Sequence, residues 1–162
     1  MDLLYRQVHL LILAPNHNSI NNEPSIGLAI IFKMARKKGQ LIYLSGQGGD
    51  EIYSDYGHNG VKYRTSSTFG GKFPDDLSSI FPWKNFYGSC QRAFIDKEEC
   101  ISGGYGIEGR YPLLDRSLVQ EFLWLTPALK NMFYKAPIHA YLAKHGYPFK
   151  LNEKIGFKII QK

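Results

Sequence analysis

Residues 41–51, LIYLSGQGGDE, decide the fold of this chain. The apolar run 41–44 shows no polar alternation, which is typical of a parallel strand covered on both faces in an α/β sheet. A glycine-rich turn follows, and two adjacent carboxylates come directly after it. Because open α/β sheets bind ligands at the carboxyl ends of their strands, the stretch predicts an α/β fold with a ligand site at this turn.

The carboxylates Asp50 and Glu51 are expected to open the next helix and have two interpretations. A carboxylate here can hold Mg²⁺, which bridges to phosphate oxygens, so one interpretation is a nucleotide–metal site. The other is structural, since acidic residues in a first helical turn gain roughly 0.3–1 kcal/mol from the helix dipole. The glycines form neither the dinucleotide fingerprint nor a P-loop, so spacing alone leaves both interpretations open.

Composition indicates a globular protein that folds as a single domain, residues 1–162. Hydrophobic residues make up 44% of the 162 residues and aromatic residues 14%, enough for one core. No segment approaches the roughly 18 apolar residues of a membrane span, and the N-terminal stretch is a poor signal peptide because it lacks a basic start. We expect a cytoplasmic protein in which Cys90 and Cys100 are buried thiols and no zinc site forms.

The net charge of +6 raises nucleic-acid binding as an alternative. The basic residues crowd the end of one predicted helix, at Lys33 and residues 36–38. Cations at a helix C-terminus are also stabilised by the dipole, which explains the cluster without a nucleic acid.

The chain in order predicts a strand–turn–helix unit and then a mainly helical C-terminal half. A helix that is apolar nearly all round, and so buried on several sides, should begin at residues 23–25 and end at Gly39. Further elements are expected as follows: a short strand at 10–13, a short helix at 52–57, a surface loop at 58–77 with an acidic helix cap at 75–76, helical structure at 77–101 whose aromatic residues pack in a core, a flexible loop at 103–106 that delivers Glu108 and Arg110, a helix capped by Asp115, and a last helix at 136–144.

Two segments resemble motifs of the asparagine synthetase family. Residues 45–51, SGQGGDE, resemble the family's S-G-x-G-x-D-E, and residues 106–115, GIEGRYPLLD, resemble G-[VIL]-E-x-R-x-P-[FL]-L-D. Residues 135–138 and 154–157 are similar to the shorter K-x-x-[IL]-R and K-x-G-F segments, in the expected order. The resemblance covers about residues 24–157 and corresponds to the later part of the synthetase domain. It implies a partial parallel sheet of the adenine-nucleotide alpha-hydrolase-like type.

The resemblance also implies a reaction and roles for particular residues. ATP and Mg²⁺ would activate aspartate, or a similar acid, as an acyl-adenylate that ammonia, supplied free or from glutamine, converts to an amide. The positions that match the family's site are Ser45, Gly46, Gly48 and Gly49 for the nucleotide, Asp50 for the metal, and Glu108, Lys135 and Gln47 for catalysis. Without the resemblance, the residues have structural interpretations. Ser45 would cap the turn, Glu108 and Arg110 would form a structural ion pair, and Lys135 would be a solvated lysine.

The chain departs from the family pattern in several places. Gln47 stands where the family often has an acid, and Asp55 stands where D-E-x-F-x-G-Y has glycine. The family's S-G-G-x-D-S pyrophosphate loop does not occur, and residue 2 is Asp2 rather than the cysteine of a glutamine-hydrolysing domain. A single Asp50 should hold Mg²⁺ poorly. We therefore expect the chain to be inactive alone: a fragment, a split subunit that needs a partner holding the missing half, or a degenerate relative.

Three other functions remain open at this stage. Gln47 leaves room for a ligase of another acid and amine, such as a cyclising or natural-product amide synthetase. A catalytically silent interaction subunit could keep the same fold. The least favoured alternative is a basic nucleic-acid-binding module.

Overall fold

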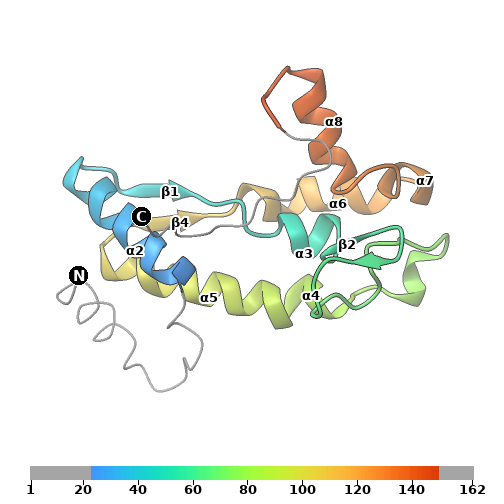
Figure 1. The fold of residues 1–162 in the computed structure, drawn as a ribbon, viewed down its shortest axis with the longest axis horizontal. Helices are drawn as coiled ribbons and strands as arrows, with labels where there is room; N and C mark the ends of the chain where they lie inside the picture. Colours follow the sequence, from blue (N-terminus) through green and yellow to red (C-terminus); the bar gives the residue numbers. More distant parts are fainter. Residues whose placement is uncertain (1–22, 150–162) are drawn as a thin grey trace. The chain divides into compact units, whose positions relative to one another are not determined.

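The computed structural model describes residues 23–149 (Figure 1). About half of these residues are helical. The elements, in order, are α2 (Glu23–Lys37), β1 (Ile42–Leu44), α3 (Gly49–Tyr53), β2 (Gly57–His58), β3 (Val61–Lys62), η1 (Leu77–Ser79), α4 (Lys84–Tyr87), α5 (Ser89–Gly104), β4 (Glu108–Arg110), η2 (Pro112–Leu114), α6 (Arg116–Trp124), α7 (Pro127–Lys130) and α8 (Ala136–Lys144). Within residues 23–149, no helix combines the length and the hydropathy needed to cross a bilayer. The strand expected at 10–13 and the motif at 154–157 lie outside the described residues.

The chain divides into two compact units. Of the described residues, the first unit holds 23–45 and 94–110, and the second holds 46–93 and 111–149. Each unit has its own hydrophobic core.

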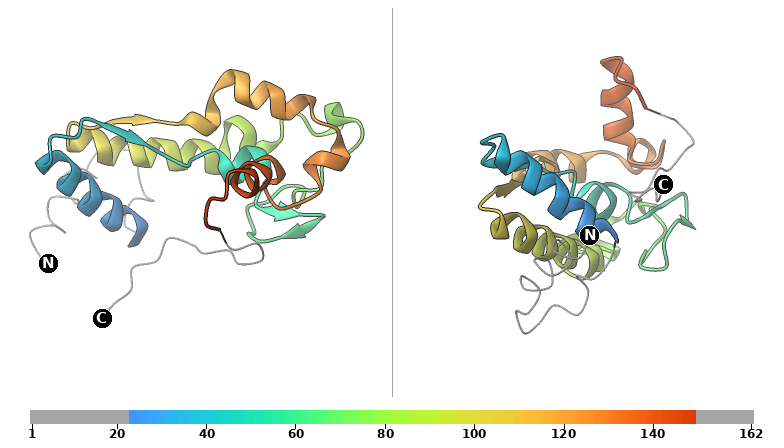
Figure 2. Two further views of the ribbon diagram at one scale, coloured as in Figure 1. Left: turned by 90° about the horizontal axis from the view of Figure 1, so that it is seen from above. Right: turned by 60° about the vertical axis from the view of Figure 1, so that its left-hand side comes forward.

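The first unit is built on a two-stranded parallel sheet, which confirms the α/β class. β1 pairs with β4 so that Ile42 lies opposite Glu108 and Leu44 opposite Arg110. The two long motifs of the sequence are therefore neighbours at this sheet. α2 and the 94–104 part of α5 lie on one side of the strands (Figures 1 and 2). Their buried side chains form the core with Tyr43, whose ring packs edge-on at 4.8 Å from Phe32.

The opposite face of this sheet is exposed, so the expectation that both faces of residues 41–44 are covered is wrong. Ile42 is 58% and Leu44 68% exposed. Side chains alternate along a strand, and only that of Tyr43 lies against the helices. The expectation that α2 is buried on several sides is wrong in part. Ala29 and Phe32 are fully buried, but Met34 is largely exposed.

The second unit has an aromatic core, as the sequence predicts for Trp83 and Phe86. The ring centroids of Phe73 and Phe122 lie 5.3 Å apart in an edge contact, and those of Phe73 and Trp83 lie 5.7 Å apart. Tyr53 extends from α3 to within 4.8 Å of Phe122. Because edge-to-face aromatic pairs are favourable beyond their buried area, this cluster fixes α3, the α4 region and α6 together.

The segment expected as a surface loop is an organised structure anchored on Asp55. It begins with the hairpin of β2 and β3, and its residues Ser67, Gly70 and Gly71 are buried. Asp55, fully buried at φ 42°, accepts hydrogen bonds from the following groups: Ser67 Oγ (3.0 Å), Thr68 N (2.6 Å), Thr68 Oγ1 (3.0 Å), Phe69 N (2.9 Å) and Asn85 Nδ2 (2.7 Å). These donors compensate the burial of the charge.

Several predicted boundaries need correction. The expected helix at 52–57 is α3, which begins at Gly49 and ends at Tyr53 because the left-handed residues Asp55 and Tyr56 turn the chain. The helical stretch at 77–101 is broken into η1, α4 and α5 by residues 80–83 and by Gly88. The loop expected at 103–106 is shorter, because Gly103 and Gly104 belong to α5, and the residues that it leads to, Glu108 and Arg110, lie on strand β4.

Other predicted features are confirmed. Asp76 caps η1, and Asp115 caps α6 by accepting from Ser117 N and Leu118 N. α8 begins at Ala136, and Gly39 follows the end of α2 with φ 75°. Cys90 and Cys100 lie outside a disulfide, but the prediction that they are buried is wrong, because both are half-buried.

Replacing Asp55 by asparagine should destabilise the second unit. Asp55→Asn removes the charge and points an amide donor at groups that are themselves donors, so we expect the free energy of unfolding to fall by about 2–4 kcal/mol. The measurement is urea unfolding followed by tryptophan fluorescence. Asp75→Asn, at an exposed position of the same region, is the control and should change stability by less than about 0.5 kcal/mol. Equal effects of the two substitutions would contradict the anchoring role of Asp55.

Candidate functional site

The turn after β1 continues the strand pairing before it bends. Ser45 is buried, and its backbone N–H donates to the Arg110 carbonyl at 2.8 Å. The turn is then closed by the Gly49 N–H, which donates to the Gly46 carbonyl at 3.3 Å. Gln47, half-buried, lies within this turn.

Gly48 is required by close packing, and Gly49 is closely packed as well. Gly48 has φ 93°, and a Cβ atom there would lie 2.2 Å from Leu114 Cδ2. A Cβ on Gly49 would lie 3.2 Å from Leu113 Cδ1 and 3.6 Å from Lys135 Nζ. The turn therefore packs against the PLLD end of the second motif and against the residue that precedes α8.

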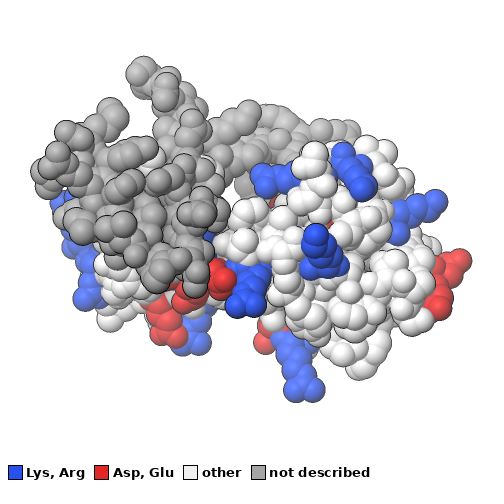
Figure 3. Space-filling model, turned by 90° about the horizontal axis from the view of Figure 1, so that it is seen from below, with Lys and Arg blue, Asp and Glu red and all other residues white. Residues whose placement is uncertain are grey.

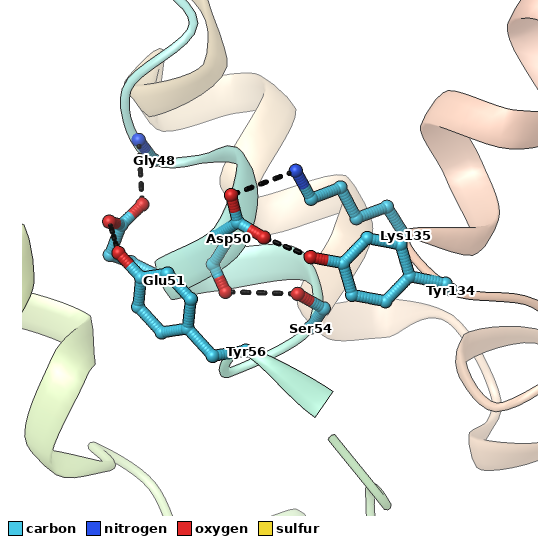
Figure 4. A network of polar contacts seen from close by, with 7 residues as sticks. All are labelled: Gly48, Asp50, Glu51, Ser54, Tyr56, Tyr134 and Lys135. Carbon is cyan, nitrogen blue, oxygen red and sulfur yellow. Dashed lines mark hydrogen bonds and ion pairs between the residues drawn. The ribbon is translucent and has the colours of Figure 1, made fainter. Parts of the chain in front are cut away.

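Asp50 is the centre of a polar network shown in Figure 4. Its Oδ2 lies 3.1 Å from Lys135 Nζ, and the side chains of both residues are about a quarter exposed. Its Oδ1 accepts a hydrogen bond from the Tyr134 hydroxyl, and its backbone carbonyl accepts from Ser54 Oγ at 3.1 Å. Burial and the Asp50 charge raise the pKa of Tyr134, so its hydroxyl remains a donor.

Glu51, in contrast, is a buried structural residue. Its Oε2 accepts from the Gly48 N–H at 3.1 Å, and its Oε1 accepts from the Tyr56 hydroxyl. Its backbone carbonyl accepts from Trp83 Nε1 at 2.8 Å. Since its carboxylate caps its own helix, the structural interpretation holds for Glu51.

Lys135 has an unusual backbone conformation at the N-terminus of α8. Its φ and ψ are 53° and 50°, a left-handed geometry that costs a side chain other than glycine about 1–2 kcal/mol. Its carbonyl accepts from the His139 N–H at 3.0 Å, which starts the helix. Its ammonium group also lies 5.2 Å from the centroid of the Tyr134 ring, a cation–π distance. Such strain is typical of residues that a surrounding structure holds in place.

Glu108 and Arg110 form the ion pair that the sequence analysis considered. Glu108 Oε1 lies 2.7 Å from Arg110 Nη2, and both side chains are more than half exposed. A pair of this exposure contributes at most about 1 kcal/mol to stability. Ser45 and Glu108 belong to the first unit, whereas the turn residues 46–49, Asp50 and Lys135 belong to the second. Within the second unit, the structure brings Lys135 next to Gly49 and Asp50.

The residues present do not make a magnesium site by themselves. Residues 23–149 contain no cluster of three or more His, Cys, Asp and Glu side chains suited to a metal. Both oxygens of Asp50 are engaged, one by an ammonium and one by a hydroxyl. Mg²⁺ needs an octahedral set of oxygen ligands, so the Asp50 environment does not fit this ion.

Tyr134 is a site residue that sequence reasoning missed. It lies 84 positions from Asp50 in the chain, and no spacing rule connects the two residues. Its position next to Lys135 was the one available signal.

Comparison of the chain with models of protein families, with curated proteins and with solved structures gives no match.

The close approach of Gly48 to Leu114 can be tested with a matched pair of variants. Gly60 has a similar φ of 84° but open space around its Cβ position. Gly60→Ala should cost only the backbone strain of about 1–2 kcal/mol, whereas Gly48→Ala adds a steric overlap of typically 1–3 kcal/mol. Urea unfolding measures the free energy of unfolding of both variants. Leu114→Ala in the Gly48→Ala background should recover part of the extra loss, and failure to recover it would contradict the packing described.

A pH dependence follows from Tyr53, whose hydroxyl donates to the Leu113 carbonyl at 2.9 Å. Burial, with the Asp115 charge, raises the pKa of Tyr53 to about 12, while an unfolded tyrosine ionises near 10. The unfolded state therefore loses its proton first, and the contribution of Tyr53 to stability, complete below pH 10, declines between about pH 10 and 12. Urea unfolding measures the free energy of unfolding at pH 9 and at pH 11. The loss of stability between the two pH values should be smaller in Tyr53→Phe than in Tyr87→Phe, the exposed control. An equal loss in the two variants would show that Tyr53 is not the source of the pH dependence.

Proposed function

We propose that this chain is part of an asparagine-synthetase-like, ATP-dependent amide ligase, with a partial sheet of the adenine-nucleotide alpha-hydrolase-like type. The proposal is supported by the way the family-like segments meet. β1, which directly precedes the first long motif, pairs in parallel with β4, which lies within the second. In the second unit, the glycine turn of the first motif contacts Leu113 and Leu114 of the second and Lys135 of the third.

The observation that carries the proposal is the ion pair of Asp50 and Lys135. Each belongs to a different segment that resembles the family, and no property of a generic strand–turn–helix unit requires them to meet. A second support comes from Asp55, whose φ of 42° is left-handed. Glycine stands at this position in the resembling motif, and glycine is the usual residue for such a conformation.

The chemistry proposed for Lys135 follows from its charge and placement. The acid substrate attacks the α-phosphorus of ATP, pyrophosphate leaves, and ammonia then displaces AMP from the acyl-adenylate. Negative charge develops on phosphate oxygens in the first step, and a cation fixed in advance stabilises it without reorganisation. Asp50 and the Tyr134 ring hold the ammonium group in such a fixed position.

The remaining roles are carried over from the resemblance. Ser45, Gly46, Gly48 and Gly49 would contact the nucleotide, and Glu108 would accept a proton from the attacking amine. Glu108 is exposed on strand β4 and is held by Arg110. Mg²⁺ remains part of the proposal for the reaction, but its ligands would have to come largely from outside residues 23–149.

Two rival functions have specific support. Gln47 replaces an acid in the turn, which favours a ligase of another acid and amine. The neutralisation of Asp50 by Lys135 favours a catalytically silent subunit. Nucleic-acid binding has less support. Arg36, in the basic cluster, donates to the Gly106 carbonyl at 3.4 Å, and on the coloured part of the face in Figure 3 Lys and Arg side chains are scattered among uncharged and acidic residues.

The test is ATP–pyrophosphate exchange and amide formation by the protein isolated from its source with its associated proteins. We expect exchange that depends on aspartate, and asparagine formation with ammonia or glutamine. Lys135→Met and Asp50→Asn should lower kcat/KM by about 10²–10³-fold, the typical effect of removing charge stabilisation. Asp76→Asn, an exposed cap in the same unit, is the control and should retain activity.

The outcomes separate the candidates. Exchange with other acids but not with aspartate would replace the proposal by the second ligase. Absence of exchange with every acid tested would refute a ligase function and leave the silent subunit. Unchanged activity in both Lys135→Met and Asp50→Asn would remove these residues from the reaction.

A further inference from the structure

The carboxylate of Asp50 is shared between two consecutive residues. Oδ1 accepts from the Tyr134 hydroxyl, and Oδ2 pairs with Lys135 Nζ at 3.1 Å. Each oxygen thus has its own partner, so rotation of the carboxylate would break both contacts together. The orientation of Asp50, and with it the position of the ammonium group, depends on the hydroxyl as well as on the charge.

The backbone is adapted to this arrangement. Consecutive side chains in regular structure point in different directions, yet those of Tyr134 and Lys135 reach one carboxylate. The left-handed conformation of Lys135 turns the chain between them so that both converge (Figure 4). The ammonium group lies next to Gly49, where a Cβ atom would be 3.6 Å from Nζ, an ordinary van der Waals distance.

The ring of Tyr134 is fixed independently of its hydroxyl. Tyr63 packs edge-on against it at 5.3 Å between ring centroids, and Lys135 Nζ lies over its face. Phenylalanine at this position would keep the ring contact with Tyr63 and lose one oxygen atom. The hydroxyl, which also interacts with the Ser54 side chain, can therefore be removed without the ring, and its contact with Asp50 holds the carboxylate.

We infer that Tyr134 is a positioning residue that fixes the Lys135 ammonium group through Asp50. Its effect on catalysis rests on the proposed ligase function, whereas its effect on Lys135 does not. When the hydroxyl is removed, the carboxylate gains rotational freedom and the ammonium group samples more positions. In the ligase reaction this lowers the stabilisation of the phosphoryl charge, because preorientation is lost.

The first experiment measures the accessibility of Lys135 without any ligand. The whole chain is treated with trace acetic anhydride at one pH, and acetylation of Lys135 relative to exposed Lys84 is read by mass spectrometry. Tyr134→Phe should raise this ratio at least 3-fold, and Asp50→Asn should raise it further. Tyr141→Phe, which removes a hydroxyl from an exposed residue of α8, the helix that follows Lys135, should leave the ratio unchanged. Circular dichroism checks the fold of each variant.

A double-mutant comparison shows whether the effect passes through Asp50. In the Asp50→Asn background, Tyr134→Phe should change the labelling ratio by less than 1.5-fold, since the carboxylate that transmits the effect is gone. An unchanged ratio in Tyr134→Phe alone, or an equal effect in both backgrounds, would overturn the inference. A general loosening of the fold would instead raise the labelling of Lys130, which is buried, and so can be told apart.

The second experiment uses the ligase assay described above. Tyr134→Phe should lower kcat about 10-fold while the KM for the acid changes less than 2-fold, because positioning acts on the transition state. An unchanged kcat in an active enzyme would overturn the catalytic part of the inference. Absence of activity in the wild-type protein would refute the proposed function, and the labelling result would still decide whether Tyr134 positions Lys135.

Discussion

The ion pair between Asp50 and Lys135 is the contact on which the second unit's polar site depends. It joins the first turn of α3 to the residue that begins α8, across 85 positions of the chain. Lys135 adopts a left-handed backbone that an isolated chain would avoid. The ion pair with Asp50 and the Tyr134 ring are contacts of its side chain in this conformation.

Two adjacent carboxylates in this turn have opposite surroundings. Glu51 is turned inward, where a backbone N–H and a buried hydroxyl fix it, while Asp50 is partly open to solvent and faces a cation. Consecutive helical residues point about 100° apart, so one side chain meets the core and the other the surface. The same geometry divides the pair into a residue that maintains the fold and a residue available for chemistry.

Local sequence signals predicted much of the fold. The β1 strand, the caps at Asp76 and Asp115, and the start of α8 each follow from rules that act over a few residues. The exposed face of β1 could not be predicted, because an apolar run indicates what a strand could bury and not which layers cover it. The order of the 58–77 segment was missed because it depends on the buried hub at Asp55, whose donors lie 12 to 30 residues away. For the same reason the sequence supplied Asp50 and Lys135 as candidates but gave no sign of Tyr134.

The left-handed position of Asp55 has a consequence for how such a loop can arise. Glycine and aspartate codons differ by a single base, so one nucleotide change can convert a freely rotating residue into an anchor at a φ that aspartate tolerates. The backbone path need not move for the exchange to occur. The change adds a carboxylate that accepts hydrogen bonds from the neighbouring segment and so orders it.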